Sequence, residues 1–261
     1  MPDSLPTHAR RDWIAEVIQE RGSVTTAELT ARFGITDTSI RHDLAVLEQA
    51  GRARRVRGGA VSRWSDAGNW EAAKRSRENL PEKRRIGARA AAMVNASEVV
   101  FLDSGSTVAS TAAAMRATFN GTSPVTVVTH SLLVMEEVGA WTPLHLVFLG
   151  GLFLPDHRAV VGPMTLASLT DLTADVAIIG CDGLTVEGGL TTPHMLIAEV
   201  GATMAAHARR VVVVADASKL GRAGFTRIVG LERVSSLITD DRADRALIEQ
   251  VRSVGVEVVI V

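Results

Sequence analysis

The sequence contains a single cysteine, Cys181, among its 261 residues. One thiol cannot form an internal disulfide framework, and it also excludes a zinc site built from several cysteines. We therefore expect no disulfide, no bound metal ion and no cofactor.

Long apolar runs are also missing. No stretch approaches the ~18–20 apolar residues that a membrane-spanning helix needs, and the opening residues MPDSLPTHARRDW lack the apolar segment of a signal peptide. Internal repeats and low-complexity tracts are absent as well. We therefore expect a cytoplasmic protein without a membrane partner. Its length suits either one large domain or a medium domain with a small one.

The formal net charge of −1 conceals an asymmetry along the chain. Residues 1–89 hold 17 Lys and Arg against 12 Asp and Glu, whereas residues 90–261 hold 11 against 17. Residues 41–63 contain six arginines and only two acidic side chains. This distribution favours a small N-terminal part that binds a polyanion, attached to an acidic body. A solvated basic surface is the alternative.

Three short helices are predicted in the first fifty residues. Apolar spacing over residues 13–18 predicts the first helix. A capping-box pattern over Thr25–Glu28 opens the second, which Gly34 ends. The third helix begins at Thr36 as its N-cap and stops at Gly51. Two short helices around a tight turn, the second with exposed polar groups, are typical of a helix-turn-helix.

A strand pair is predicted directly after these helices. Arginine and valine alternate over residues 54–57 before the Gly-Gly pair at 58–59, a pattern that suits a two-stranded wing with outward arginines. Such arginines can contact phosphates while helix side chains read base edges. A module that binds protein instead of DNA remains the alternative.

The rest of the chain predicts an α/β domain. Residues 63–79 are polar and predict a linker, and Asn79 is the expected N-cap of a helix with Pro81 in its first turn. Val-, Ile- and Leu-rich runs then alternate with helical segments, which indicates a mainly parallel sheet covered on both faces. The predicted strands are Val99–Leu102, Val125–Val128, Leu144–Leu149, Val176–Ile179, Val211–Ala215, Leu237–Thr239 and Val256–Val261. We expect domains at 1–62 and 80–261.

Small and polar residues follow the predicted strands. Asp103–Thr107, with sequence DSGST, can cradle an anion with backbone N–H groups and a helix N-terminus, although an ordinary capped turn is the alternative. The Gly-Lys-Ser/Thr element of a Walker A loop is missing. Because ligands bind at the carboxyl ends of parallel strands, these residues are expected to share one site with the other strand ends. Those ends are Thr129-His130, Gly150-Gly151, Asp182-Gly183 and Asp216–Lys219.

Residues 24–60 resemble the DNA-binding signature of the DeoR family of bacterial transcriptional regulators. The resemblance rests on Glu28-Leu29, Phe33-Gly34, Thr36–Leu44 and Gly58–Ala60. The family commonly has Arg where this chain has His42, which replaces a permanent charge with a weaker donor. Pattern and resemblance together assign DNA contacts to Thr36, Thr38, Ser39, Arg41, His42, Arg54, Arg55 and Arg57.

Residues 80–261 resemble the DeoR-family effector domain, which is similar in fold to ribose-5-phosphate isomerase and CoA transferases. The matching motifs include Glu82-Lys83, Leu102–Thr107 and Ala215–Lys219. The resemblance implies that a phosphorylated sugar or related metabolite binds here and changes DNA affinity. Effector contacts are expected from Asp103, Ser104, Gly105, Ser106, Thr107, His130, Gly151, Arg158, Asp182, Glu199 and Lys219. The family usually has Asn at the position of His130, so this side chain is a candidate for selectivity.

An isomerase of the resembling type carries a second acidic residue in its Asp-Gly-Ala-Asp motif. This chain has Asp182-Gly183-Leu184-Thr185, so that carboxylate is missing. A sugar-phosphate isomerase is therefore the weaker alternative. We expect a DNA-binding regulator that represses a sugar or polyol operon. It is expected to act on double-stranded operator DNA as a dimer or higher homo-oligomer, since paired heads multiply affinity.

Overall fold

The computed structural model describes residues 6–61, 72, 74–119, 124–139, 141–142 and 144–261. The chain divides into two compact units, Met1–Ala73 and Lys74–Val261, which we treat separately. Most of the predicted linker 63–79 lies outside the described residues. Residues 74–77 are helical and belong to the larger unit. Among the described residues, none of the helices combines the length and apolar character needed to cross a bilayer.

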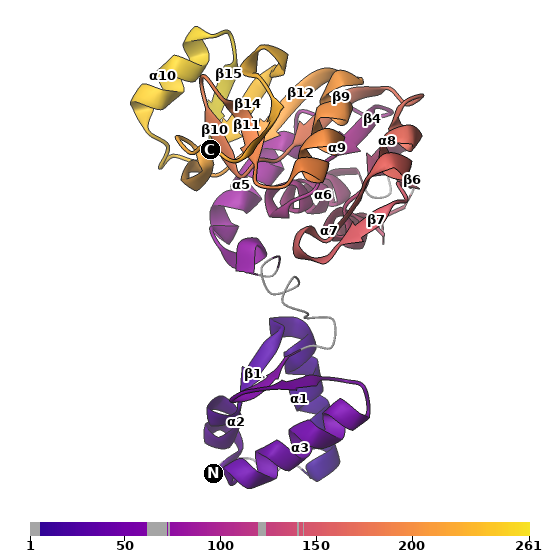
Figure 1. The fold of residues 1–261 in the computed structure, drawn as a ribbon, viewed down its shortest axis with the longest axis vertical. Helices are drawn as coiled ribbons and strands as arrows, with labels where there is room; N and C mark the ends of the chain where they lie inside the picture. The colour runs from indigo at the N-terminus through magenta and orange to yellow at the C-terminus, as the bar shows by residue number, and fades with distance from the viewer. Residues whose placement is uncertain (1–5, 62–71, 73, 120–123, 140, 143) are drawn as a thin grey trace. The chain divides into compact units, whose positions relative to one another are not determined.

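The small unit consists of three helices and a three-stranded antiparallel sheet (Figure 1). Its elements are α1 (Thr7–Arg21), β1 (Ser23–Thr25), α2 (Thr26–Phe33), α3 (Asp37–Gln49), β2 (Arg54–Val56) and β3 (Gly59–Val61). The predicted capping box of α2 is present, since Thr25 and Glu28 bond each other's backbone N–H groups. Strand β1, which pairs with β3, was not predicted because three residues between two helices carry no periodic pattern.

The core of the larger unit is a seven-stranded sheet whose neighbours all pair in parallel, which confirms the predicted α/β fold class. The seven predicted strands are the seven strands of this sheet. In sheet order they are β15 (Glu257–Ile260), β14 (Ser236–Thr239), β12 (Ala208–Val214), β9 (Ala174–Ile179), β4 (Val99–Leu102), β5 (Val125–Thr129) and β6 (Leu144–Phe148).

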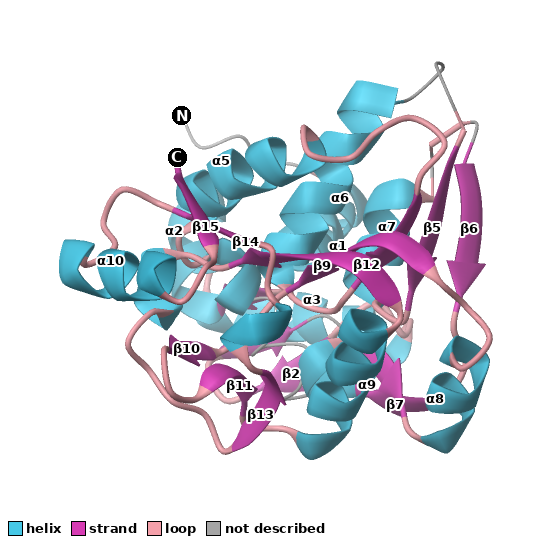
Figure 2. Cartoon of the chain, turned by 90° about the horizontal axis from the view of Figure 1, so that it is seen from above, coloured by secondary structure: helices cyan, strands magenta, loops and turns pink. Residues whose placement is uncertain are grey.

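Helices cover both faces of the sheet, with α6 and α9 on opposite sides (Figure 2). Alternate residues of each strand enter two separate cores: Val100 and Leu102 pack with α5–α7, whereas Phe101 packs with α8–α10. This two-sided burial explains the near-continuous apolar runs of the strands. The helices are α5 (Leu80–Ala91), α6 (Ser106–Phe119), α7 (Leu132–Val138), α8 (Pro163–Leu169), α9 (Met195–Ala206) and α10 (Arg245–Ser253).

Two small antiparallel sheets border the main one, and the sequence did not predict them. One is the hairpin of β7 (Leu152–Leu154) and β8 (Ala159–Val161), joined by the single-turn helix η1 (Pro155–His157). The other joins β10 (Gly183–Thr185), β11 (Gly189–Thr192) and β13 (Thr226–Val229). Strands of three residues are too short for a pattern to be recognised, and the four-residue strands β11 and β13 lack the continuous apolar run of the main sheet.

The order of the strands reverses direction between β4 and β9. The chain runs outward from β4 through β5 to β6, then crosses over to β9 and continues through β12 and β14 to β15. The loops after β4 and β9 therefore leave the sheet in opposite directions. In open parallel sheets this is the crevice where ligands bind.

Gly87 allows α5 and α6 to approach closely. A Cβ atom at this position would lie 2.7 Å from the backbone carbon and oxygen of Ser110 in α6. Backbone atoms cannot move aside as a flexible side chain can, so the two helices would have to separate.

We expect Gly87→Ala to destabilise the larger unit by about 1–3 kcal/mol despite the better helix propensity of alanine, because it overpacks this contact. Urea unfolding of the full chain, followed by circular dichroism, tests this. Arg84→Ala changes an exposed residue of the same helix and is expected to stay within about 0.5 kcal/mol of the unsubstituted protein. Equal or higher stability of the Gly87 variant would show that the contact is not tight.

Candidate functional site

The recognition helix of the small unit is α3, whose outer face carries the predicted DNA contacts. Thr36, Thr38, Ser39, Arg41 and His42 are all exposed. Thr36 caps the helix by accepting a hydrogen bond from the backbone N–H of Ser39, and the two hydroxyls are 3.0 Å apart. The Arg41 guanidinium pairs with Asp37 at 2.5 Å, yet 62% of its side chain remains exposed.

Two arginines of α1 hold α3 in place through one buried carboxylate. Asp43 is 1% exposed and accepts hydrogen bonds from Arg10 and Arg11, each at 2.7 Å. Leaving a buried carboxylate without its partners is strongly unfavourable, so this pairing fixes the helix whose outer face is polar. The sequence signal was a charge on the same helical face as Ile40 and Leu44.

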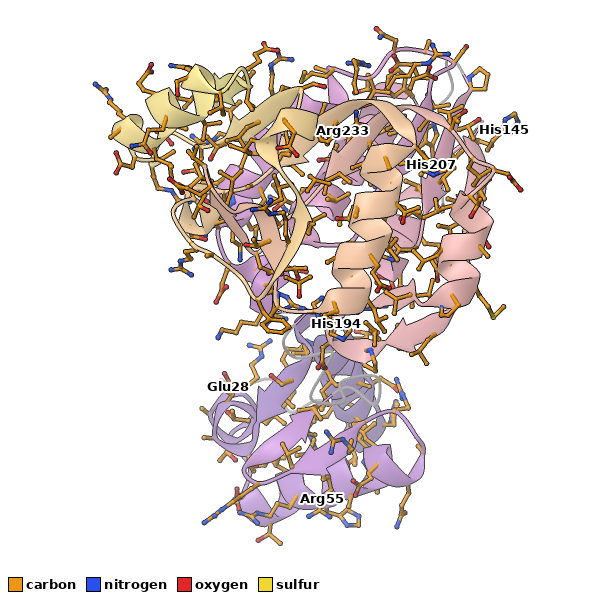
Figure 3. All side chains as sticks on the ribbon, turned by 45° about the horizontal axis from the view of Figure 1, so that its top comes forward. Glu28, Arg55, His145, His194, His207 and Arg233 are labelled. Atoms are coloured by element: carbon orange, nitrogen blue, oxygen red, sulfur yellow. The ribbon has the colours of Figure 1, made fainter. Side chains whose placement is uncertain are left out.

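The predicted wing is present as the β2–β3 hairpin, with its turn at Arg57-Gly58. Arg54, Arg55 and Arg57 are exposed as predicted, and Figure 3 labels Arg55 on this hairpin. Val56 between them is 42% exposed as well, so all three residues of β2 are exposed. The backbone N–H of Arg55 donates to Glu48, which ties the wing to α3.

In the larger unit, the loop after β4 begins the candidate effector site. Asp103, Ser104 and Thr107 are buried, and Ser106 is the first residue of the 14-residue helix α6. Gly105 has φ 116°, a conformation that favours glycine, and its Cβ position faces open space. A Cβ atom on Gly180, which follows β9, would lie 3.2 Å from the backbone oxygen of Ser104. The loops after β4 and β9 therefore meet.

His130 follows β5 and is completely buried. Its Nε2 lies 3.0 Å from Oδ1 of Asp103, and its Nδ1 lies 2.7 Å from the carbonyl oxygen of Val160 in β8. Both partners accept hydrogen bonds, whereas a neutral imidazole has a single N–H. Both ring nitrogens are engaged with protein groups.

The predicted contacts around the β7–β8 hairpin have structural partners. A Cβ atom on Gly151 would lie 2.2 Å from the Thr165 hydroxyl oxygen of α8, so glycine is required there by packing. The Arg158 guanidinium pairs with Glu136 of α7. Glu199 lies on the exposed face of α9.

The loops after β9 and β12 bring further polar groups to the same edge. Asp182 accepts a hydrogen bond from the Thr192 hydroxyl at 2.8 Å. Asp216 is completely buried, and its Oδ1 accepts from Ser218. Its Oδ2 is buried without a hydrogen-bond partner among the described residues. Lys219 is the last residue of the single-turn helix η2 (Ala217–Lys219).

Lys83 of α5 was not among the predicted site residues. It is 3% exposed, and its ammonium group donates to the carbonyl oxygens of Arg75 (2.5 Å) and Glu78 (2.6 Å). Burial lowers the pKa of Lys83, and the charge of Lys219 lowers it further, although Asp216 opposes the shift. The signal in the sequence was a lysine on the same helical face as Ile86 and Ala90.

Asn79 differs from its predicted role. It is the N-cap residue of α5, but it has φ 52° and its side chain makes no capping bond. Its amide instead donates to Asp216 Oδ1 at 3.0 Å and accepts from Arg242 at 3.2 Å. The start of α5 is thereby tied to the carboxyl ends of β12 and β14. Hydrogen bonds between residues so far apart in the chain cannot be predicted from the neighbouring sequence.

Asp240 and Arg242 complete this network after β14. Burial alone raises the pKa of Asp240, but hydrogen bonds from the Arg242 side chain and from the backbone N–H groups of Ala217 and Arg242 outweigh it and lower that pKa. The Arg242 guanidinium also pairs with Glu82 of α5 at 3.4 Å.

The described residues of the candidate site offer hydrogen-bond donors for an anion and hydrogen-bond acceptors for hydroxyl groups. They include no activated nucleophile. Burial, with Asp182 next to it, raises the pKa of the Cys181 thiol to about 12, so the sulfur stays protonated and unreactive. Among the described residues, no group of three His, Cys, Asp or Glu side chains is placed to hold a metal ion. The predicted position of a second carboxylate is occupied by Thr185, whose hydroxyl accepts from Gly188.

A winged helix-turn-helix joined to an α/β unit with polar side chains at the carboxyl ends of its parallel strands defines a ligand-responsive DNA-binding regulator. Comparison with known proteins agrees. Residues 10–65 match the DeoR-like helix-turn-helix domain, and residues 78–241 match the DeoR C terminal sensor domain. The chain belongs to the DeoR family of transcriptional regulators, as its sequence predicted.

Curated relatives are regulators along their whole length. HTH-type transcriptional regulator GlpR of Haloferax volcanii is 32% identical and aligns over 98% of both chains. HTH-type transcriptional repressor GlcR of Bacillus subtilis is 27% identical over 95% of this chain and 93% of its own. Among solved structures, ribose 5-phosphate isomerase A of Methanocaldococcus jannaschii matches 55% of each chain with 19% identity and a TM-score of 0.41. The family models and the curated relatives show that the chain is a transcriptional regulator.

We expect Asp240→Asn to lower the free energy of unfolding at neutral pH and to lower it less at acidic pH. Because the folded-state pKa of Asp240 is lowered, its carboxylate stabilises the fold above the unfolded pKa of about 3.9, and this contribution is lost as the pH falls through the folded value. Urea unfolding between pH 7 and pH 3 measures the difference.

Asp241→Asn is the matched control, because that side chain is 67% exposed and pairs only with the exposed Arg85 among the described ion pairs. It is expected to have little effect at any pH. A loss of stability in Asp240→Asn that is the same at every pH would contradict the role of the carboxylate charge.

Proposed function

We propose that this regulator represses a sugar or polyol catabolic operon and that a phosphorylated sugar, bound at the carboxyl edge of the sheet, relieves the repression. The observation that carries the proposal is the loop Asp103–Thr107 at the reversal of strand order, which leads into the N-terminus of α6. The relative named as a repressor supports the direction of control.

The phosphate group is assigned to the first turn of α6. The N–H groups of a helix's first turn have no partner within the helix, and the helix dipole adds positive potential there. Gly105, with φ 116°, lets the backbone curl toward an anion, and nothing crowds its Cβ position. The hydroxyls of Ser104, Ser106 and Thr107 can add donors.

Lys219 is assigned as the cation that faces this cradle. It follows β12, which is the neighbour of β9 in the sheet, and its charge acts on both Lys83 and Cys181. A buried anion needs a cation or several oriented donors to offset its desolvation. Asp182 and Asp103 supply acceptors for hydroxyl groups of the same ligand.

The other predicted contacts receive supporting roles. Because both nitrogens of His130 bond protein groups, we assign this residue to the orientation of Asp103. Arg158 is assigned to anchoring the β7–β8 hairpin through Glu136, and Gly151 to the packing of the loop before β7. Glu199 remains a candidate contact at the exposed end of the site.

Control of DNA binding requires that the effector bind one conformation or assembly more tightly than another. An effector with equal affinity for both would not change their populations. We expect the protein to act as a dimer or tetramer, because two recognition helices on repeated half-sites multiply affinity. Arg41, His42 and the wing arginines are assigned to the operator.

We expect Arg41→Ala to weaken binding to operator DNA by about 10- to 100-fold, the cost of one lost base or phosphate contact, without changing effector binding. Fluorescence anisotropy on duplex DNA from upstream of the protein's own gene, at several salt concentrations, measures it. Arg84→Ala removes an exposed arginine of the larger unit and is expected to leave DNA affinity unchanged. An equal loss of DNA affinity in both variants would mean that the overall positive charge of the protein, and not α3, determines DNA binding.

We expect Lys219→Met to lower the affinity for phosphate esters by about 10- to 100-fold and to leave DNA bound when an ester is added. Isothermal titration with a panel of sugar phosphates and their unphosphorylated sugars tests the first part, and anisotropy tests the second. Arg209→Met is the control, because Arg209 lies near the amino end of β12, at the opposite edge of the sheet. Unphosphorylated sugars that bind as tightly as their esters would contradict the proposal.

A further inference from the structure

Two histidines from distant parts of the chain meet at the same edge of the sheet. His157 ends the η1 turn of the β7–β8 hairpin, and His194 immediately precedes α9. Their rings are 5.2 Å apart between centroids with an interplanar angle of 68°. Figure 3 shows His194 at the end of α9 opposite to His207. The function proposed above uses neither ring.

Asp182 connects this pair with the candidate effector site. Its carboxylate accepts from Thr192, two residues before His194, and its charge acts on His157. The same carboxylate acts on Cys181, which also senses the charges of Asp103 and Lys219. The two histidines therefore lie beside the strand ends that are proposed to bind the effector.

The surroundings of His157 favour the neutral form of its ring. Burial lowers its pKa, and the positive charge of Arg75 and the neighbouring His194 lower it further, against the opposing effects of Asp182 and Asp156. A neutral imidazole offers one donor and one acceptor, which suits a hydroxyl group. Phosphate oxygens need donors only, so a neutral imidazole is less suited to them than to a hydroxyl group.

His194 has an unused hydrogen-bonding atom. Its Nδ1 is buried and has no partner among the described residues. The other buried or half-buried imidazoles differ: His130 bonds Asp103 and the Val160 carbonyl, and Nδ1 of His207 bonds the Leu172 carbonyl. A buried polar atom without a partner is unfavourable, so a ligand hydroxyl placed there gains a bond at little cost.

We propose that His157 and His194, together with Asp182, bind the hydroxyl groups of the effector and so determine which sugar or polyol phosphate the protein senses. This assignment rests on the proposed function, in which the phosphate of the same ligand occupies the loop Asp103–Thr107. The ligand class is a monophosphate ester with a polyhydroxyl chain or ring.

The experiment compares inorganic phosphate with a panel of tetrose, pentose, hexose and polyol phosphates by isothermal titration. His157→Phe and His194→Phe keep an aromatic ring and remove its hydrogen-bonding atoms. Each substitution is expected to lower the affinity for the ester that the unsubstituted protein binds most tightly by about tenfold or more. The affinity for inorganic phosphate is expected to change by less than about twofold. His194→Asn restores a donor and an acceptor and is expected to recover part of the ester affinity.

His145→Phe is the matched control, because His145 is exposed on β6 and lies away from His194 in Figure 3. Unchanged ester affinity in both Phe variants, or an equal loss of phosphate and ester affinity, overturns the assignment of the pair. It also fails if the unsubstituted protein binds no ester more tightly than inorganic phosphate. If the protein binds neither, the proposed function itself is wrong.

Discussion

The site of the larger unit depends on one topological constraint, the reversal of strand order between β4 and β9. Right-handed crossovers place the helices that follow β4 and β9 on opposite faces of the sheet, and the loops after these two strands meet in one region at its carboxyl edge. Asp103 and Asp182 lie in it because each follows one of the two strands. His130 and Lys219 follow the next strands outward on either side.

Burial then determines how these polar groups behave. Asp103, His130 and Asp216 are almost completely inaccessible, and such groups persist only when hydrogen bonds replace lost water. The carboxylate of Asp103 is held by His130, whose other nitrogen holds β8. Movement of the β7–β8 hairpin and the orientation of Asp103 are therefore coupled through a single imidazole. Replacement of His130 by another side chain would alter both.

The sequence was sufficient for the main sheet because two-sided burial imposes a continuous apolar pattern on each strand. It was also sufficient for the recognition helix, whose capping residues and inward Ile40, Leu44 and Leu47 follow local rules. It failed where contacts are long-range. Neither the bond of Asn79 to Asp216 nor the position of Lys83 among site residues is encoded in neighbouring positions. The η1 turn with His157 belongs to strands too short to predict.

Lys83, which sequence reasoning missed, and Asn79, whose role it misassigned, lie in one segment, residues 75–83. Lys83 holds the backbone of Arg75 and Glu78, and Asn79 holds Asp216, while Lys83 senses the charges of Asp216 and Lys219. The first residues of the larger unit are thus bonded to the groups around the candidate effector site. A regulator needs its ligand to favour one arrangement of groups over another. Lys219 and Lys83 already act on each other electrostatically, so an anion bound beside Lys219, as proposed, would also act on the lysine whose carbonyl bonds hold this segment.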